Sequence, residues 1–251
     1  MSTPLNGKTA LVTGSTSGIG RAIADVLANR GVHVIVSGRN TERGARAVAE
    51  IREAGGKADF VQADLTSADS ARTLAEQARS VTGQIDILVN NAGVFPEGAT
   101  ADTTEELFDA VYNTNVKAPF FLVAELVPGM VERGGGAVVN VSSFVADKAA
   151  PDRVAYSSSK AALNNLTKAW AKQYGPSGVR VNSVAPGAVV PEEVQAAIAD
   201  DPRAAAAVDA VPARRFGLPR EIAEAVAYLA SDDAAFVHGA FLNVDGGASV
   251  A

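Results

Sequence analysis

The sequence predicts an α/β protein with a parallel sheet covered by helices on both faces. Short apolar runs alternate with helical patterns along all 251 residues, and no Pro-, Gly- or Ser-rich linker divides them. A glycine-rich turn directly follows the first of these runs. We therefore expect one domain over residues 1–251, with a doubly wound Rossmann architecture and ligands beyond the carboxyl ends of the strands.

The predicted strands are short and largely apolar, as expected for strands buried on both faces. They are Thr9 to Thr13, Val32 to Ser37, Asp59 to Ala63, Ile85 to Val89, Ala137 to Val141, Val179 to Val184 and Ala240 to Val244, which makes a seven-stranded sheet. The helices between them repeat apolar residues at helical spacing. They are Ile19 to Arg30, Thr41 to Ala54, Ser67 to Thr82, Thr104 to Glu132, Ala155 to Tyr174 and Pro219 to Ala230.

Two regions with different tasks are expected within the domain. Residues 1–150 would form the cofactor half, and residues 151–251 would carry a catalytic helix and a substrate lid. The lid is the polar, alanine-rich insertion at residues 188–216, between the sixth strand and the last helix. Residues 144–155 form a second stretch on which the choice of substrate depends.

Composition argues against several functions. The net charge is −6 and the basic residues are scattered, so neither nucleic acid nor an anionic membrane is an expected partner. No cysteine is present, and the only histidines, His33 and His238, lie far apart, so no metal site is expected. The segment Met1 to Lys8 lacks an apolar leader, and charged residues and prolines interrupt the most apolar run. The expected location is the cytoplasm.

The first strand-to-helix turn predicts a dinucleotide site. Glycines there let the backbone turn tightly and approach a pyrophosphate, while the N-terminus of the following helix attracts the negative charge. The position of the turn between a strand and a helix supports this interpretation over a merely structural turn. The residues predicted to bind the cofactor are Gly14, Ser15, Thr16, Ser17, Gly18, Ile19 and Gly20.

The end of the second strand favours NADP over NAD. An acidic residue there would bind the ribose 2′-hydroxyl of NAD, but the chain reads Ser37-Gly38-Arg39. Arg39 can pair with a 2′-phosphate, and Gly38 places no carboxylate beside it. The alternative is that Arg39 is a solvated loop charge.

Tyr156 and Lys160 form a candidate proton-transfer pair. They lie four residues apart in a predicted helix, so both side chains project from one face. A positive charge about 4 Å from the phenol, at an effective dielectric of about 20, is worth about 4 kcal/mol, or about three pK units before screening. The pKa of the tyrosine would then approach neutrality, where an acid/base catalyst works best. Taken alone, such a pair is more often a pair of surface neighbours.

Together these motifs resemble the short-chain dehydrogenase/reductase family over essentially the whole chain. The matching motifs, in order, are the turn at residues 13–20, Asn90-Asn91-Ala92-Gly93, Asn115 in Asn-Val-Lys, Ser143, Tyr156 with Lys160, Pro186-Gly187 and Val244-Asp245-Gly246-Gly247. The resemblance implies an oxidoreductase that moves a hydride between the nicotinamide of NADP and a ketone or secondary alcohol.

The resemblance also implies a role for each catalytic residue. Tyr156 would be the general acid/base, and Lys160 would lower its pKa and hold the nicotinamide ribose. Ser143 would hydrogen-bond the substrate oxygen; Ser142 is the competitor, but its side chain should point to the opposite face. Asn115 would link Lys160 to solvent through water, unless it only caps or kinks its helix.

Further cofactor contacts follow from the same resemblance. Asp64 would contact adenine through its side chain and Leu65 through its backbone. The remaining implied contacts are Asn91, Ala92 and Gly93 on the adenosine side, and Pro186, Gly187 and Val189 at the nicotinamide. A threonine that is common in the family after the sixth strand is replaced by Pro191, so its hydroxyl is missing here.

The lid length and the segment Arg215 to Ile222 most resemble bacterial 3-oxoacyl-[acyl-carrier-protein] reductases and their relatives. Reduction of 3-oxoacyl thioesters, dehydrogenation of a sugar, polyol or hydroxy-lipid, and a catalytically idle dinucleotide-binding protein are the alternative functions. Basic residues before the fifth and sixth strands are sparse, which argues against binding of a carrier protein. The family resemblance further implies a homotetramer. The candidate contacts are Phe120, Phe121, Leu122, Phe236 and Phe241, and the alternative is that they belong to the core.

Overall fold

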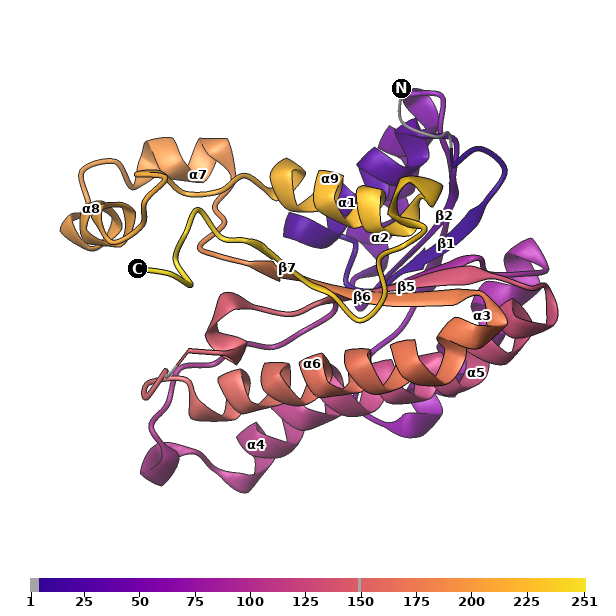
Figure 1. The fold of residues 1–251 in the computed structure, drawn as a ribbon. Helices are drawn as coiled ribbons and strands as arrows, with labels where there is room; N and C mark the ends of the chain where they lie inside the picture. Colours follow the sequence, from indigo (N-terminus) through magenta and orange to yellow (C-terminus); the bar gives the residue numbers. More distant parts are fainter. Residues whose placement is uncertain (1–4, 149) are drawn as a thin grey trace.

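The computed structural model describes residues 5–148 and 150–251. Residues 1–4, part of the segment without an apolar leader, and Ala149, within a stretch expected to affect the choice of substrate, lie outside the described residues. A seven-stranded parallel sheet forms the centre of the molecule, with helices on both of its faces (Figure 1). The predicted fold class is therefore confirmed.

All seven predicted strands are present, and their bounds differ from the prediction by at most two residues. They are β1 (Thr9–Val12), β2 (His33–Gly38), β3 (Lys57–Gln62), β4 (Ile87–Asn90), β5 (Gly136–Val141), β6 (Val179–Pro186) and β7 (Phe241–Val244). Their order in the sheet is β3-β2-β1-β4-β5-β6-β7. The order reverses between β1 and β4, and at such a point the loops beyond the two strands diverge and leave room for a ligand.

Helices α1 (Gly18–Asn29), α2 (Thr41–Glu53) and α9 (Pro219–Ala230) cover one face of the sheet (Figure 1). The other face carries α3 (Ala68–Thr82), α4 (Glu105–Tyr112), α5 (Ala118–Glu132) and α6 (Val154–Tyr174). The insertion after β6 contains two further helices, α7 (Glu192–Ala197) and α8 (Pro202–Asp209), which the sequence did not predict. Neither helix has a buried residue, so neither needs the apolar periodicity on which helix prediction depends.

The prediction of a single helix from Thr104 to Glu132 is wrong in one respect. It consists of α4 and α5 joined by a π-helical turn, Asn113–Lys117. A π turn inserts an extra residue into a helix and is frequent at functional sites. Asn115 lies inside this turn and is fully buried.

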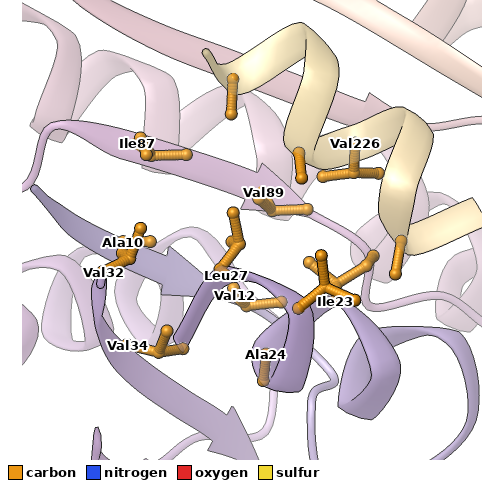
Figure 2. Close-up of a cluster of buried hydrophobic side chains, with 14 of the residues drawn as sticks. Ala10, Val12, Ile23, Ala24, Leu27, Val32, Val34, Ile87, Val89 and Val226 are labelled. Atoms are coloured by element: carbon orange, nitrogen blue, oxygen red, sulfur yellow. The ribbon is translucent and has the colours of Figure 1, made fainter. Parts of the chain in front are cut away.

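Two apolar layers hold the sheet to its helices. Figure 2 shows part of the first, in which Val12 of β1, Leu27 of α1 and Val226 of α9 are fully buried. The second layer lies against α3, α5 and α6 and includes Leu11 and Leu163. Neighbouring residues of β1 thus enter opposite layers, and each fully buried aliphatic side chain contributes about 1.5–3 kcal/mol. This core fixes the strands whose carboxyl ends carry the candidate site.

Candidate active site

A cavity of about 560 Å³ lies at the carboxyl ends of the strands. Every residue predicted to bind cofactor or to act in catalysis lines it, except Ser15 and Asn115. Further lining residues that the sequence did not predict include Asn40, Arg43, Val94, Phe95 and Thr114. The available signal was their closeness in the chain to the predicted motifs, because they lie within four residues of Arg39, Gly93 or Asn115.

The glycine turn fits a dinucleotide pyrophosphate. A Cβ on Gly20 would lie 2.3 Å from the carbonyl oxygen of Gly14, and one on Gly14 would lie 2.9 Å from the Cα of Ala92, so both sites require glycine. Gly18 has a φ of 57°, and its absent side chain leaves open space. Ser17 makes no side-chain cap on α1, whose first turn contains no acidic residue. An uncapped helix N-terminus without negative charge suits a bound anion.

Ser15 has a structural role and does not line the cavity. Its hydroxyl is fully buried, donates to the carbonyl oxygen of Val12 at 2.6 Å and accepts from the backbone nitrogen of Ser37 at 2.9 Å. Its own backbone nitrogen donates to the carbonyl oxygen of Ser37 at 2.9 Å. The prediction that Ser15 contacts the cofactor is therefore not supported, because its polar groups already tie the turn to β2.

Two arginines lie at the end of the cavity beside β2. The Arg39 and Arg43 side chains both line the cavity, and within residues 5–148 and 150–251 neither forms an ion pair. Asn40 caps α2 by accepting from the backbone nitrogen of Arg43 at 2.8 Å, which fixes where that helix begins. The backbone of Arg39 is held by the side-chain amide of Gln62, at 2.9 Å from its carbonyl oxygen. This end of the cavity therefore offers two guanidinium groups to an anion.

Asn91 connects the loop after β4 to the glycine turn. Its side-chain nitrogen donates to the carbonyl oxygens of Thr13, at 2.8 Å, and Gly14, at 3.1 Å. The Thr13 hydroxyl in turn accepts from the backbone nitrogens of Asn91 and Ala92, both at 3.0 Å. The two loops expected to face a cofactor are thus held together by four hydrogen bonds. Asp64 and Leu65, from the loop after β3, complete this part of the lining.

The catalytic candidates meet at the other end of the cavity. Tyr156 lies in the first turn of α6, and Lys160 follows one turn later on the same face. The Lys160 ammonium lies 5.8 Å from the centre of the Tyr156 ring and donates to the carbonyl oxygen of Val141 at 2.8 Å. Ser143, two residues after β5, is buried, lines the same cavity and lies close enough to Tyr156 to lower the pKa of its phenol. The hydroxyl of Ser142 is buried and has no hydrogen-bond partner among the described residues.

The pKa values correct one expectation from the sequence. Burial raises the pKa of Tyr156 above its ordinary value, while the hydrogen bond with Ser143 and the charge of Arg153 lower it less. Burial also lowers the pKa of Lys160 to about 8. The predicted lowering of the Tyr156 pKa by Lys160 is therefore wrong for this arrangement, because the ammonium donates to the Val141 carbonyl and burial removes much of the water around both groups.

Asn115 has a fully buried side chain that does not line the cavity. Its amide accepts from the backbone nitrogen of Val94 and donates to the carbonyl oxygen of Val94, both at 2.9 Å. It also donates to the Ser159 hydroxyl at 3.0 Å, and that hydroxyl donates to the carbonyl oxygen of Tyr156 at 2.7 Å. Asn115 thus joins the loop after β4 to the helix of Tyr156, and its link to Lys160 through water stays a prediction.

Comparison with known proteins agrees with this geometry. A family model described as enoyl-(acyl carrier protein) reductase matches residues 14–249. A solved structure of a short chain dehydrogenase/reductase family protein is 43% identical, covers 99% of this chain and 100% of its own, and superposes with a TM-score of 0.89. The chain belongs to the short-chain dehydrogenase/reductase family. As a member of this family, it is an oxidoreductase that acts on CH–OH or C=O groups.

Relatives within the short-chain dehydrogenase/reductase family differ in their named substrates. The 3-oxoacyl-[acyl-carrier-protein] reductase of Thermotoga maritima is 36% identical over 97% of this chain and 98% of its own length. The cyclopentanol dehydrogenase of a Comamonas species is 38% identical over 97% of both chains. The gluconate 5-dehydrogenase of Burkholderia cenocepacia, solved with NADP and tartrate, is 31% identical, covers 98% of this chain and 97% of its own, and has a TM-score of 0.90.

Among the residues that the structure describes, no helix is both long enough and apolar enough to cross a bilayer.

Proposed function

We propose that the protein is an NADP-dependent oxidoreductase that interconverts a ketone and a secondary alcohol, with Tyr156 as general acid/base. The observation that carries this proposal is the meeting of Tyr156, Ser143 and Lys160 at one end of a cavity whose other parts suit a dinucleotide. Bound NADPH would supply the hydride from its nicotinamide. The protein's own groups would then need only to orient the carbonyl and deliver a proton.

The three side chains have complementary tasks in this proposal. The Ser143 hydroxyl would donate to the carbonyl oxygen of the substrate and stabilise the negative charge that develops there. Tyr156 would give its phenolic proton to that oxygen. Because burial raises the pKa of Tyr156, the phenol is protonated at neutral pH and stands ready for carbonyl reduction. Lys160 would hold the ribose beside the nicotinamide and keep a positive charge near the phenol.

The cofactor preference rests on the two arginines beside β2. Arg39 and Arg43 line the cavity without an ion-pair partner among the described residues, and a 2′-phosphate would supply one. Two relatives support the choice. The gluconate 5-dehydrogenase named above is in complex with NADP, and a blue fluorescent protein from a metagenomic library, 33% identical with a TM-score of 0.90, is in complex with NADPH.

The acid/base role is tested with Tyr156→Phe, which removes one oxygen and keeps the ring. Wild type and variant are compared for NADPH oxidation on a panel of 3-oxoacyl thioesters, keto-sugars and simple ketones. We expect kcat to fall by about 10²- to 10⁴-fold in the variant, while NADPH binding is kept. Turnover that is unchanged in the variant, or no turnover in wild type, would favour a dinucleotide-binding protein without this catalysis.

The cofactor preference is tested with Arg39→Ala. Loss of a hydrogen-bonded charge pair costs about 1.5–3 kcal/mol, so the Kd for NADPH should rise by about 10- to 150-fold. The Kd for NADH, which lacks the phosphate, should change little. Equal effects on both cofactors would refute the phosphate-binding role. Cofactor fluorescence titration measures both constants.

We keep the homotetramer and the cytoplasmic location as further proposals from the family resemblance. Phe120 and Phe236 are exposed apolar residues that a subunit contact would cover. Sedimentation equilibrium of the full chain tests the tetramer, and a monomer at micromolar concentration would rule it out.

A further inference from the structure

A short segment crosses the catalytic end of the cavity and carries an exposed aromatic ring. We define residues 94–98 as the entrance segment; its first two residues, Val94 and Phe95, line the cavity. The Phe95 side chain is 69% exposed, although phenylalanine is usually buried. Its ring centre lies 6.4 Å from that of Tyr156, with an interplanar angle of 68°. An apolar face is thus held open to solvent directly beside the candidate acid/base.

The entrance segment is anchored at both ends to the region of Tyr156. At the start, the Asn115 side chain binds both the nitrogen and the carbonyl oxygen of Val94 at 2.9 Å. At the end, the backbone nitrogen of Gly98 donates to the carbonyl oxygen of Asp152 at 2.7 Å, and Gly98 pairs with Arg153 in a parallel bridge. Because Arg153 is the N-cap of α6, Phe95 is positioned by the same elements that position Tyr156.

Two cations near this end of the cavity, Arg153 and Lys148, already have oxygen partners among the described residues. Arg153 forms a 2.5 Å ion pair with Glu97 and lies 3.8 Å from Asp152. The Lys148 ammonium donates to the carbonyl oxygens of Ala248 and Ala251, at 2.9 and 2.7 Å. Neither cation lines the cavity, and each already holds oxygen partners, so neither is directed towards a carboxylate or phosphate on a substrate.

The residues lining the catalytic end are otherwise neutral. In the described part of the chain they are Val94, Phe95, Ser142, Ser143, Tyr156, Pro186, Gly187 and Val189, together with the buried Lys160. Arg39 and Arg43, which form no ion pair with any described residue, lie at the other end of the cavity, beside β2. The ammonium of Lys160 is already engaged by the Val141 carbonyl, so a carboxylate next to the reacting carbon would lose part of its water and find no unengaged cation among these residues, which is costly.

We propose that Phe95 is a specificity-determining residue that selects neutral substrates with an apolar ring beside the reacting carbon. The substrate class is alicyclic and aryl ketones and the corresponding secondary alcohols. The carbonyl would sit at Tyr156 and Ser143, while the ring of the substrate packs on the Phe95 face. This inference rests on the proposed function, because it names the substrate class of the same site.

The test compares two ketones that share a ring and differ by one charge, cyclohexanone and 3-oxocyclohexane-1-carboxylate. Steady-state kinetics with saturating NADPH are measured for wild type, Phe95→Ala and Phe95→Leu. The control is Phe108→Ala, which removes a partly exposed phenyl from α4, outside the cavity. NADPH titration shows for each variant that the fold and the cofactor site are intact.

We expect wild type to favour cyclohexanone by at least about tenfold in kcat/KM. Phe95→Ala should lower kcat/KM for cyclohexanone by roughly 10- to 30-fold, chiefly through KM, because the lost contact is apolar binding rather than proton transfer. Phe95→Leu should keep most of the activity, since leucine restores much of the apolar surface. Phe95→Ala should change kcat/KM for 3-oxocyclohexane-1-carboxylate by less than about threefold. Phe108→Ala should have the kcat/KM values of wild type for both ketones.

Two outcomes separate the inference from the function on which it rests. The inference is wrong, and the oxidoreductase function stands, if wild type has the same kcat/KM for the carboxylate as for cyclohexanone. The same conclusion holds if Phe95→Ala lowers the two kcat/KM values equally. If wild type binds NADPH but reduces neither ketone nor any other carbonyl compound of the panel above, the proposed function fails, and the inference fails with it.

Discussion

Lys160 should make the protein less stable at neutral pH than it would be with an uncharged side chain. The residue is 4% exposed, and burial lowers its pKa from 10.5 to about 8. Within the described part of the chain, its hydrogen-bond partner is the carbonyl oxygen of Val141. We therefore predict that Lys160→Met abolishes catalysis but raises the free energy of unfolding at pH 7.

The magnitude follows from linkage between protonation and folding. A shift of 2.5 pK units, at about 1.36 kcal/mol per unit, makes the buried charge cost about 3 kcal/mol at pH 7. The variant leaves the Val141 carbonyl without this donor, which offsets about 1 kcal/mol or somewhat more. We expect a net gain in unfolding free energy of about 1–3 kcal/mol at pH 7.

The pH dependence has a definite sign. Below pH 8 the lysine is protonated in both the folded and the unfolded chain, so the full penalty applies. Between pH 8 and 10.5 the folded chain loses the proton first, so the penalty shrinks as pH rises and has vanished above 10.5. At pH 10 about 1 kcal/mol of the penalty should remain. The advantage of the variant over wild type should therefore fall by about 2 kcal/mol between pH 7 and 10.

Urea unfolding of wild type and Lys160→Met at pH 7 and pH 10 measures this difference. Other groups titrate in the same range, but their contribution cancels in the comparison of variant with wild type at each pH. Lys172→Met removes an exposed lysine from the same helix and accounts for the loss of charge alone. An unfolding free-energy difference that is the same at both pH values would show that burial does not shift the lysine and would refute the reasoning.

Three further predictions concern the frame of the site. Gly20→Ala should weaken NADPH binding more than tenfold in a fluorescence titration, because its Cβ would lie 2.3 Å from a carbonyl oxygen of the same turn. The control is Gly135→Ala, because the nearest atom to its added Cβ would be 3.5 Å away. Equal NADPH affinities of the two variants would contradict the turn geometry. Glu221→Gln should lower the free energy of unfolding at pH 7 by about 1 kcal/mol. The loss is this small because the Glu221 carboxylate is partly exposed and solvent screens its pair with Arg215. The hydrogen bond from Arg215 lowers the Glu221 pKa from 4.5 to about 2, so this loss should shrink as pH falls from 4.5 towards 2, and a constant difference would exclude it. Arg180→Met should lower the unfolding free energy by about 2–3 kcal/mol without changing NADPH affinity, because the guanidinium donates to the carbonyl oxygens of Leu229, Ala230 and Ser231 at the end of α9 and of Ala234 in the turn that follows. A loss below about 0.5 kcal/mol would show that water replaces it.

The sequence by itself determined the fold class and the location of the site. Alternation of apolar runs with helical patterns depends on neighbours along the chain, so all seven strands could be predicted from it. The spacing of Tyr156 and Lys160 placed both on one helix face for the same reason. The glycine turn was recognisable because the backbone at Gly14 and Gly20 leaves no room for a side chain.

Only the tertiary structure decided how individual polar groups are used. Ser15 is committed to Ser37 and Asn115 to Val94, partners that lie 22 and 21 residues away in the chain. Local patterns carry no information on such pairs. Phe95 likewise becomes a candidate substrate contact only because folding brings it against Tyr156.

The pKa values show most clearly what the sequence determined and what only the tertiary structure decided. The sequence supplied an ammonium near a phenol, and Coulomb's law alone predicted a lowered pKa for Tyr156. The fold buries Lys160, partly buries Tyr156 and directs the ammonium to the Val141 carbonyl, so loss of water outweighs attraction and the direction of the shift reverses. Spacing along the chain thus determines which groups meet, whereas packing between distant elements determines how much water they keep and hence how they titrate.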